Sequence, residues 1–211
     1  MKELLKSEEF MAIVNNHRRD KERTPNITTL PDIYTEDTSD SLFDISDNKN
    51  GGTIIRPQGT GTAHYFNSSQ IPVRNMRFIS YENFIDNLGE NYNYNWYRVD
   101  FIAYDTSEAK SYIIMHELSE GKLDSKKSKG LNQLQNTLMR LFESKAIKEY
   151  IKSFKNRWCI LSATEGAQSA PIDMIAGFNH IYDLVPDPEP IKASLITNRG
   201  FKAWKTLNVK L

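Results

Sequence analysis

The chain has 211 residues, 39% of them apolar and 11% aromatic, which is enough for the core of one domain and excludes a wholly disordered protein. Its 27 basic and 27 acidic side chains cancel, and this neutrality on its own argues against a polyanionic partner. There is no run of about 18 apolar residues, no uncharged N-terminal hydrophobic segment and no cysteine besides Cys159, so we expect a cytoplasmic protein without membrane segment, disulfide or thiolate zinc site.

The charges are unevenly distributed along the chain. Residues 24–50 carry six acidic side chains and one basic one, whereas residues 122–157 carry ten basic and three acidic ones. Residues 191–211 carry five basic side chains and no acidic one. A polyanion responds to charge within a Debye length of about 10 Å, so overall neutrality is a weak argument against nucleic acid. The same lysines would equally suit the solvated face of an ordinary helix.

The first quarter of the chain predicts a helix followed by an acidic arm. Apolar residues recur at roughly helical spacing within residues 3–22, and Thr24-Pro25 ends the pattern. Residues 27–52 are rich in Thr, Asp, Ser and Asn, which is typical of an extended arm or a long loop. The next segment, PQGTGT at 57–62, lacks the remaining residues of a phosphate-binding motif, so a nucleotide-binding loop is an unfavoured alternative.

Short strands are expected at 53–56, 64–66 and 73–79, with a short helix at 81–87. The clearest signals follow. Residues 96–105 (WYRVDFIAYD) and 111–118 (SYIIMHEL) have the composition of strands, and the short connection between them predicts an antiparallel hairpin. A long amphipathic helix is expected from Ser128, and an apolar strand at 157–163.

This order of elements predicts a mixed α/β fold in which helices flank a mixed β-sheet. We divide the chain into an N-terminal helix and acidic arm (1–52), an α/β core (53–185) and a Pro-linked basic C-terminal extension (186–211).

Two acidic residues fall on the predicted hairpin. Asp100 lies in its first strand and Glu117 ends its second, so antiparallel pairing would bring them side by side. Two carboxylates at one strand end favour a hard divalent cation, which can activate water and stabilise charge on a phosphoryl group. In the alternative, Asp100 is an edge-strand charge and Glu117 pairs with Lys122 or Arg98. His116 faces away from Glu117, and we expect a packing or surface role for it.

The stretch YRVDFIAYD, five residues, SYIIMHELSEGK and then a helix with NQLQNTL resembles the PD-(D/E)xK nuclease superfamily over roughly residues 95–165. The resemblance implies a restriction-endonuclease-like fold of αβββαβ order and metal-dependent cleavage of nucleic-acid phosphodiesters. It also implies that Asp100 and Glu117 bind magnesium or manganese and that Gln133 supports the site.

The sequence departs from that family pattern at one position. If Glu117 begins the E-x-K motif, Ser119 stands where the family has lysine. Glu120-Gly121-Lys122 also reads E-x-K, so Glu120 is an alternative ligand, although Gly121 would have to lie in the strand. We favour Glu117 as the ligand and Lys122 as the replacement lysine. The residues expected to contact substrate are Lys126, Lys127, Lys129, Gln133 and Arg140.

The sequence therefore supports two functions. The first is a magnesium-dependent nuclease-like protein whose catalytic residues are Asp100, Glu117 and Lys122, with nucleic acid as its partner. The second is a non-catalytic structural or accessory subunit of a phage or mobile-element assembly built on the same fold, with a protein partner or a homo-oligomeric state. Ser119, the acidic arm and the proline-linked tail favour the second reading.

Overall fold

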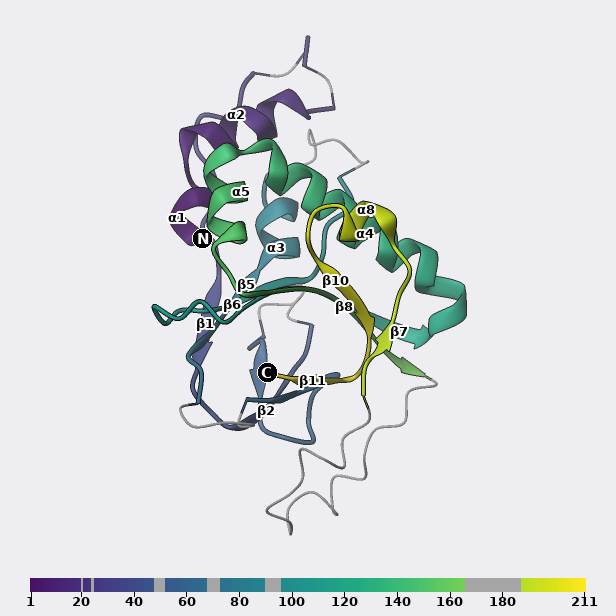
Figure 1. Cartoon of the computed structure of the whole chain (residues 1–211). Helices are drawn as coiled ribbons and strands as arrows, with labels where there is room; N and C mark the ends of the chain where they lie inside the picture. Colours follow the sequence, from purple (N-terminus) through teal and green to yellow (C-terminus); the bar gives the residue numbers. More distant parts are fainter. Residues whose placement is uncertain (20, 24, 48–51, 68–72, 90–95, 166–186) are drawn as a thin grey trace.

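The computed structural model describes residues 1–19, 21–23, 25–47, 52–67, 73–89, 96–165 and 187–211, with the backbone alone at 120–127 and 163–165. These residues form a mixed α/β fold with a 7-stranded main sheet and a 4-stranded small sheet. The labelled helices all lie on one side of the main sheet, whereas β2 and β11 of the small sheet lie on the other side (Figure 1). The expectation of helices flanking a mixed sheet is confirmed.

The main sheet has the strand order β1-β5-β6-β7-β8-β10-β9. Strands β5, β6 and β7 form an antiparallel meander, and β8 runs parallel to β7. A parallel neighbour requires a crossover connection, which α4 and α5 supply. The bounds are β1 Thr35–Thr38, β5 Met76–Ser80, β6 Phe101–Asp105, β7 Tyr112–Lys122, α4 Leu123–Glu143, α5 Lys145–Lys152, β8 Asn156–Glu165, β9 Glu189–Pro190 and β10 Lys202–Lys205.

Serine caps divide two helices that the sequence predicts as continuous. The segment 3–22 forms α1 (Lys2–Leu5) and α2 (Glu8–Asn16), and Ser7 accepts a hydrogen bond from the backbone N–H of Phe10. In the same way, the hydroxyl of Ser144 accepts the N–H of Ile147 and starts α5 as a separate helix. A serine at this position satisfies an amide that the first turn leaves free, so it begins a new helix. The short helices α3 (Tyr81–Asp86) and α8 (Ser194–Thr197) complete the set of labelled helices.

The small sheet covers the face of the main sheet that the helices leave open. Its strand order is β11-β4-β2-β3, and its members are Asn208–Lys210, Ala63–Phe66, Leu42–Ile45 and Ile55–Arg56. Aromatic side chains fill the space between the sheets, where Tyr65 stacks on Phe43 with ring centroids 5.1 Å apart and meets Phe78 edge-on. The molecule therefore has two apolar layers, one on each face of the main sheet.

The acidic arm and the basic tail both contribute to these layers. The expectation of a loop throughout residues 27–52 is wrong, because β1 pairs with β5 and β2 pairs with β4. The composition conceals β1, since a short strand at a sheet edge needs few apolar side chains, whereas β2 is a short apolar segment between two strands of the small sheet. The helix-side core takes buried residues from all three parts of the chain, among them Ile33, Leu134 and Phe201.

The glycine-rich loop at 57–62 is held by a buried carboxylate. Oδ2 of Asp44 accepts the backbone N–H groups of Thr60 and Gly61, both at 2.9 Å, and Oδ1 lies 2.7 Å from Nδ1 of His64. A bound phosphate would need these same amides. The loop is therefore a structural turn of the small sheet, and the structure does not support its use as a nucleotide-binding loop.

Gly61→Ala is expected to lower the free energy of unfolding by about 1–3 kcal/mol, the usual cost of overpacking a core. A Cβ at this position would lie 2.5 Å from Cβ of Asp44 and 2.7 Å from the carbonyl oxygen of Ile45, and neither atom can move without shifting β2. Urea unfolding measures the change. Gly52→Ala is the control, because a Cβ there meets only the guanidinium of Arg56, at 3.3 Å. Equal stability of the two variants would contradict this account.

Candidate metal site

Asp100 lies immediately before β6, whereas the sequence predicted a strand from Trp96. The backbone before it bonds to side chains of α4 and not to a neighbouring strand. The hydroxyl of Thr137 accepts the N–H of Val99 at 3.0 Å, and the amide of Gln133 donates to the carbonyl of Arg98 at 2.9 Å. Gln133 thus fixes the chain two residues before Asp100, which is a positioning role.

The hairpin register brings Asp100 and Glu117 together. Phe101 pairs with His116, so the next position of the antiparallel ladder sets Asp100 opposite Glu117. The backbone N–H of Leu118 donates to Oδ2 of Asp100 at 2.5 Å, which ties the carboxylate to the neighbouring strand. The two acids are only 4% and 5% exposed. The structure therefore agrees with the expected pairing of these residues.

Two further acids, Asp47 and Glu82, come from other elements of the fold. One oxygen each of Asp47, Glu82 and Asp100 lie within 4.8 Å of one another. Asp47 follows β2, and Glu82 lies in the first turn of α3, whose N–H groups at Tyr81 and Glu82 donate to the main-chain carbonyl of Asp100 at 2.9 and 3.2 Å. Glu117 is not part of this group of three but lies beside Asp100 on the adjacent strand.

The donor set suits a hard divalent cation. Magnesium binds oxygen ligands at about 2.1 Å in octahedral geometry, so ligand atoms on opposite sides lie about 4.2 Å apart. Adjacent ligand atoms lie about 3.0 Å apart in the same geometry, so the three oxygens, all within 4.8 Å of one another, would have to move closer together on binding. Carboxylates held this close repel one another unless a cation or a proton neutralises them. Arg98, whose Nη2 lies 3.7 Å from Oε1 of Glu82, supplies part of the balancing charge.

Strand β7 continues through Gly121 to Lys122, so the expectation that it ends at residue 118 is wrong. Ser119 pairs with Ala163 and Lys122 pairs with Glu165, with a register shift between the two pairs. Strand β7 thus contains one extra residue there, which is a β-bulge. Because paired positions share a face of the sheet, the bulge sets position 122 on the same face as Glu117 and Ser119. Glu120 lies within the bulge.

Position 122, where the sequence predicted the replacement lysine, therefore lies on the face of β7 that carries Glu117. Because of the bulge, positions 119 and 122 are separated along the strand by the length of two regular residues, which is about 6.6 Å. Ser119 itself is buried in the sheet. The side chains of Glu120, Lys122, Lys126 and Lys127 lie outside the described part of the chain.

Helix α4 crosses the sheet directly over Glu117. It starts at Leu123 and not at Ser128 as the sequence predicted. A Cβ on Gly130 would lie 3.5 Å from Cγ of Glu117 and 2.6 Å from Cδ1 of Leu161, so this glycine permits the close approach. The helix and the strand together bury the Glu117 carboxylate.

The remaining residues predicted to contact substrate have different surroundings. Lys129 is exposed to solvent at the N-terminal part of α4. Arg140 lies over the ring of Trp96, 5.2 Å from its centroid, and donates to Oε1 of Glu143 at 2.9 Å. Its guanidinium is therefore engaged in contacts within the helical layer.

His116 lies on the opposite face of β7 from Glu117, in the layer between the two sheets. It is fully buried, and its ring nitrogens bond to the hydroxyls of Tyr65 and Ser162 at 2.7 and 2.8 Å. Burial lowers the pKa of His116 to about 3, so the imidazole is neutral. The residue takes the packing role and does not reach the carboxylates.

Comparisons with protein-family models, with curated proteins and with solved structures find no match to the chain. None of the helices within the described ranges is long and apolar enough to cross a membrane.

Proposed function

We propose that the protein is a metal-dependent, nuclease-like phosphodiester hydrolase with magnesium or manganese at the carboxylate cluster. The observation that carries the proposal is the convergence of Asp47, Glu82 and Asp100 beside the buried Glu117. Three acids from separate parts of the chain meet within 4.8 Å and a fourth lies beside Asp100 on the adjacent strand, at an electrostatic cost that a divalent cation would remove.

The topology supports the same proposal. Elements α2, β5, β6, β7, α4 and β8 come in the order αβββαβ along the chain, with β1 to β4 inserted after α2, α3 between β5 and β6, and α5 between α4 and β8. Asp100 stands at the start of the second strand of this series and Glu117 on the third. These are the positions that the resemblance to the PD-(D/E)xK superfamily implies for the metal-binding acids.

A cation at this cluster would lower the pKa of a bound water and neutralise charge on a phosphoryl oxygen. Asp47, Glu82 and Asp100 would hold it, and Glu117 would hold it or its water from the adjacent strand. Gln133 would keep Asp100 in place through the backbone of Arg98. Lys122, at the edge of the site, is the residue we propose to stabilise the developing charge in place of the usual lysine.

Asp100→Asn and Glu117→Gln are expected to lower divalent-dependent cleavage of DNA or RNA by about 10³-fold or more, because each 1.36 kcal/mol of lost charge stabilisation costs a factor of ten. Gel assays with plasmid DNA and with single-stranded RNA, in magnesium, in manganese and in EDTA, measure the loss. The control is Glu108→Gln, an exposed acid in the turn at the far end of the same hairpin. Equal cleavage by all variants, with circular dichroism showing intact folds, would refute the site.

A second candidate function rests on Ser119. A buried serine at the lysine position favours a protein that binds nucleic acid without cutting it and serves as a structural or accessory subunit of an assembly. Nucleic-acid binding by the wild type without cleavage under any metal condition would favour this candidate. Light scattering coupled to size-exclusion chromatography would then show whether the chain forms an oligomer.

A further inference from the structure

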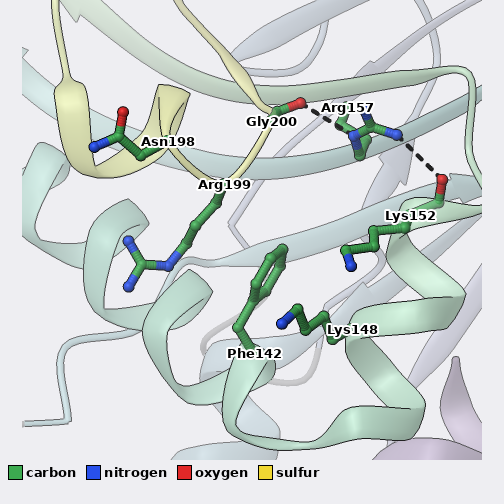
Figure 2. A pocket seen from close by; sticks show the side chains of 7 residues that line it. All are labelled: Phe142, Lys148, Lys152, Arg157, Asn198, Arg199 and Gly200. Carbon is green, nitrogen blue, oxygen red and sulfur yellow. Dashed lines mark hydrogen bonds between the residues drawn. The ribbon is translucent and has the colours of Figure 1, made fainter.

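A basic hollow lies on the helical side of the molecule, at the N-terminal ends of β8 and β10. Its cavity volume is about 730 Å³. Figure 2 shows the residues that line it, which come from the end of α4, from α5, from the start of β8 and from the turn between α8 and β10: Phe142, Lys148, Lys152, Arg157, Asn198, Arg199 and Gly200. None of the acids proposed to bind the metal is among them.

The hollow joins two basic segments that are distant in the sequence. Lys148, Lys152 and Arg157 belong to the basic region 122–157, whereas Arg199 belongs to the basic tail. Four of its seven lining residues are cationic and none is acidic. Lys148 and Lys152 are four residues apart and therefore leave α5 on one face, toward Phe142 and the 198–200 turn (Figure 2).

The arginines are anchored by main-chain carbonyls. Arg157 donates from Nε to Gly200 at 3.0 Å and from Nη1 to Lys152 and Phe154 at 3.1 and 2.8 Å. Arg199 donates from Nη1 to the carbonyl of Leu195 at 2.7 Å. Neutral carbonyls orient a guanidinium without cancelling its charge. Anchored guanidiniums match phosphate oxygens and lose little entropy when they bind them.

Gly200 keeps the wall beside Arg157 open. It has a φ of +79°, which L side chains rarely adopt, and a Cβ there would lie 3.4 Å from Nη2 of Arg157. The nearby acid Glu149 bonds to Lys152 at 3.1 Å, and within the described residues no ion pair is found for Lys148, Arg157 or Arg199. The hollow therefore holds an excess of positive charge, and an anion would relieve the repulsion.

We propose that the basic hollow binds the phosphodiester backbone of a nucleic acid. The identity of the anion rests on the proposed function, whereas the charge and the geometry of the hollow do not. Gly130 lies over Glu117 and Phe142 lies twelve residues further along α4, a separation of about 18 Å. At 3.4 Å per nucleotide step of one strand, the hollow contacts the backbone about five nucleotides from the metal site.

The test neutralises Lys148 and Arg199, two lining cations for which no ion pair is found among the described residues; Arg199 bonds to the nearby carbonyl of Leu195. Lys148→Gln/Arg199→Gln is compared with Lys155→Gln/Lys192→Gln, which removes the same charge from two exposed lysines outside the hollow. The probes are a labelled 20-base-pair DNA duplex and a labelled 20-nucleotide RNA. Anisotropy titrations in EDTA, over a series of sodium chloride concentrations, give Kd and its salt dependence.

For the better-bound probe, the hollow variant is expected to weaken binding about tenfold, and the slope of log Kd against log salt should fall by nearly two, one unit for each lost phosphate contact. The control should bind within about twofold of wild type. Equal Kd values and slopes for the two variants would overturn the proposal. Calorimetry with inorganic phosphate and adenosine 5′-monophosphate is the second readout, and a mononucleotide that binds as tightly as the oligonucleotide would also overturn it.

The outcome is separable from that of the proposed function. Binding that depends on the hollow, without cleavage, would refute the proposed hydrolase activity and would still support nucleic-acid binding by the hollow. Cleavage that depends on Asp100, with equal binding by the hollow variant and its control, would refute the hollow alone.

Discussion

Manganese or magnesium is expected to raise the unfolding temperature of the wild-type protein by about 5–10 °C. An ion at a hundred times its dissociation constant contributes about 2.7 kcal/mol to the folded state, and 1 kcal/mol shifts the midpoint of a chain of this size by about 2–4 °C. The oxygens of Asp47, Glu82 and Asp100 that would bind it lie within 4.8 Å of one another. Thermal unfolding followed by circular dichroism, in EDTA and in each metal, measures the shift.

Asp47→Asn and Glu82→Gln are expected to lose this stabilisation while keeping or raising the unfolding temperature in EDTA. Removing one charge weakens the repulsion among the remaining carboxylates and at the same time removes a ligand. This opposite response to metal and to EDTA distinguishes a metal site from an acid that merely supports the fold, whose loss would lower stability under both conditions.

Glu108→Gln is again the control, since this exposed acid lies in the turn between β6 and β7, away from the cluster. It should show the full wild-type shift. A wild-type protein whose unfolding temperature is the same in EDTA, magnesium and manganese would contradict the metal site, and so would variants that shift as much as the wild type.

The pairing of Asp100 with Glu117 could be predicted because it depends on local information. Two strands joined by a short connection must be antiparallel, and their alternation places both acids near one end of the hairpin. Asp47 and Glu82 could not be predicted in this way. Asp47 is placed by the small sheet packing on the main one, and Glu82 by the carbonyl of Asp100 bonding to the first turn of α3.

The position of the lysine is a second feature that the sequence conceals. Regular alternation from Glu117 would put residue 122 on the opposite face of β7, and only the bulge after Ser119 returns it to the face of the site. Similarly, the charge count identified the basic region 122–157, but it could not show which of its cations make contacts inside the helical layer and which line the hollow. Arg140 turns inward against Trp96, whereas Lys148 and Lys152 join Arg199 around the hollow.

A chain of hydrogen bonds centred on His116 crosses the layer between the two sheets. The hydroxyl of Ser162 donates to the carbonyl of Thr206 at 2.5 Å, so its oxygen must accept from Nε2 of His116. Nδ1 is then unprotonated and accepts the hydroxyl of Tyr65. The chain joins β4, β7, β8 and the turn after β10, and it requires a neutral imidazole.

The protein is expected to lose about 2 kcal/mol of stability between pH 6.5 and pH 5 because of this histidine. Burial lowers its pKa from 6.5 to about 3 in the folded state. Below pH 6.5 the unfolded chain therefore binds a proton that the folded chain does not. The stabilisation is complete above pH 6.5 and is lost as the pH falls toward 3, at 1.36 kcal/mol for each pKa unit. Urea unfolding at pH 7.5, 6.5, 5.5 and 5 measures it.

His116→Gln separates this contribution from those of the other titrating groups. The glutamine amide can accept from Tyr65 and donate to Ser162 but carries no charge in this range, so the variant should be less stable at pH 7.5 and should depend much less on pH between 6.5 and 5. His17→Gln, which removes a histidine at the C-terminal end of α2 on the helical side, controls for the loss of a histidine outside the layer between the sheets. If His116→Gln and the wild type lose stability in parallel, the buried imidazole is not the acid-sensitive group, and the hydrogen-bond chain through Ser162 would have to tolerate a protonated ring.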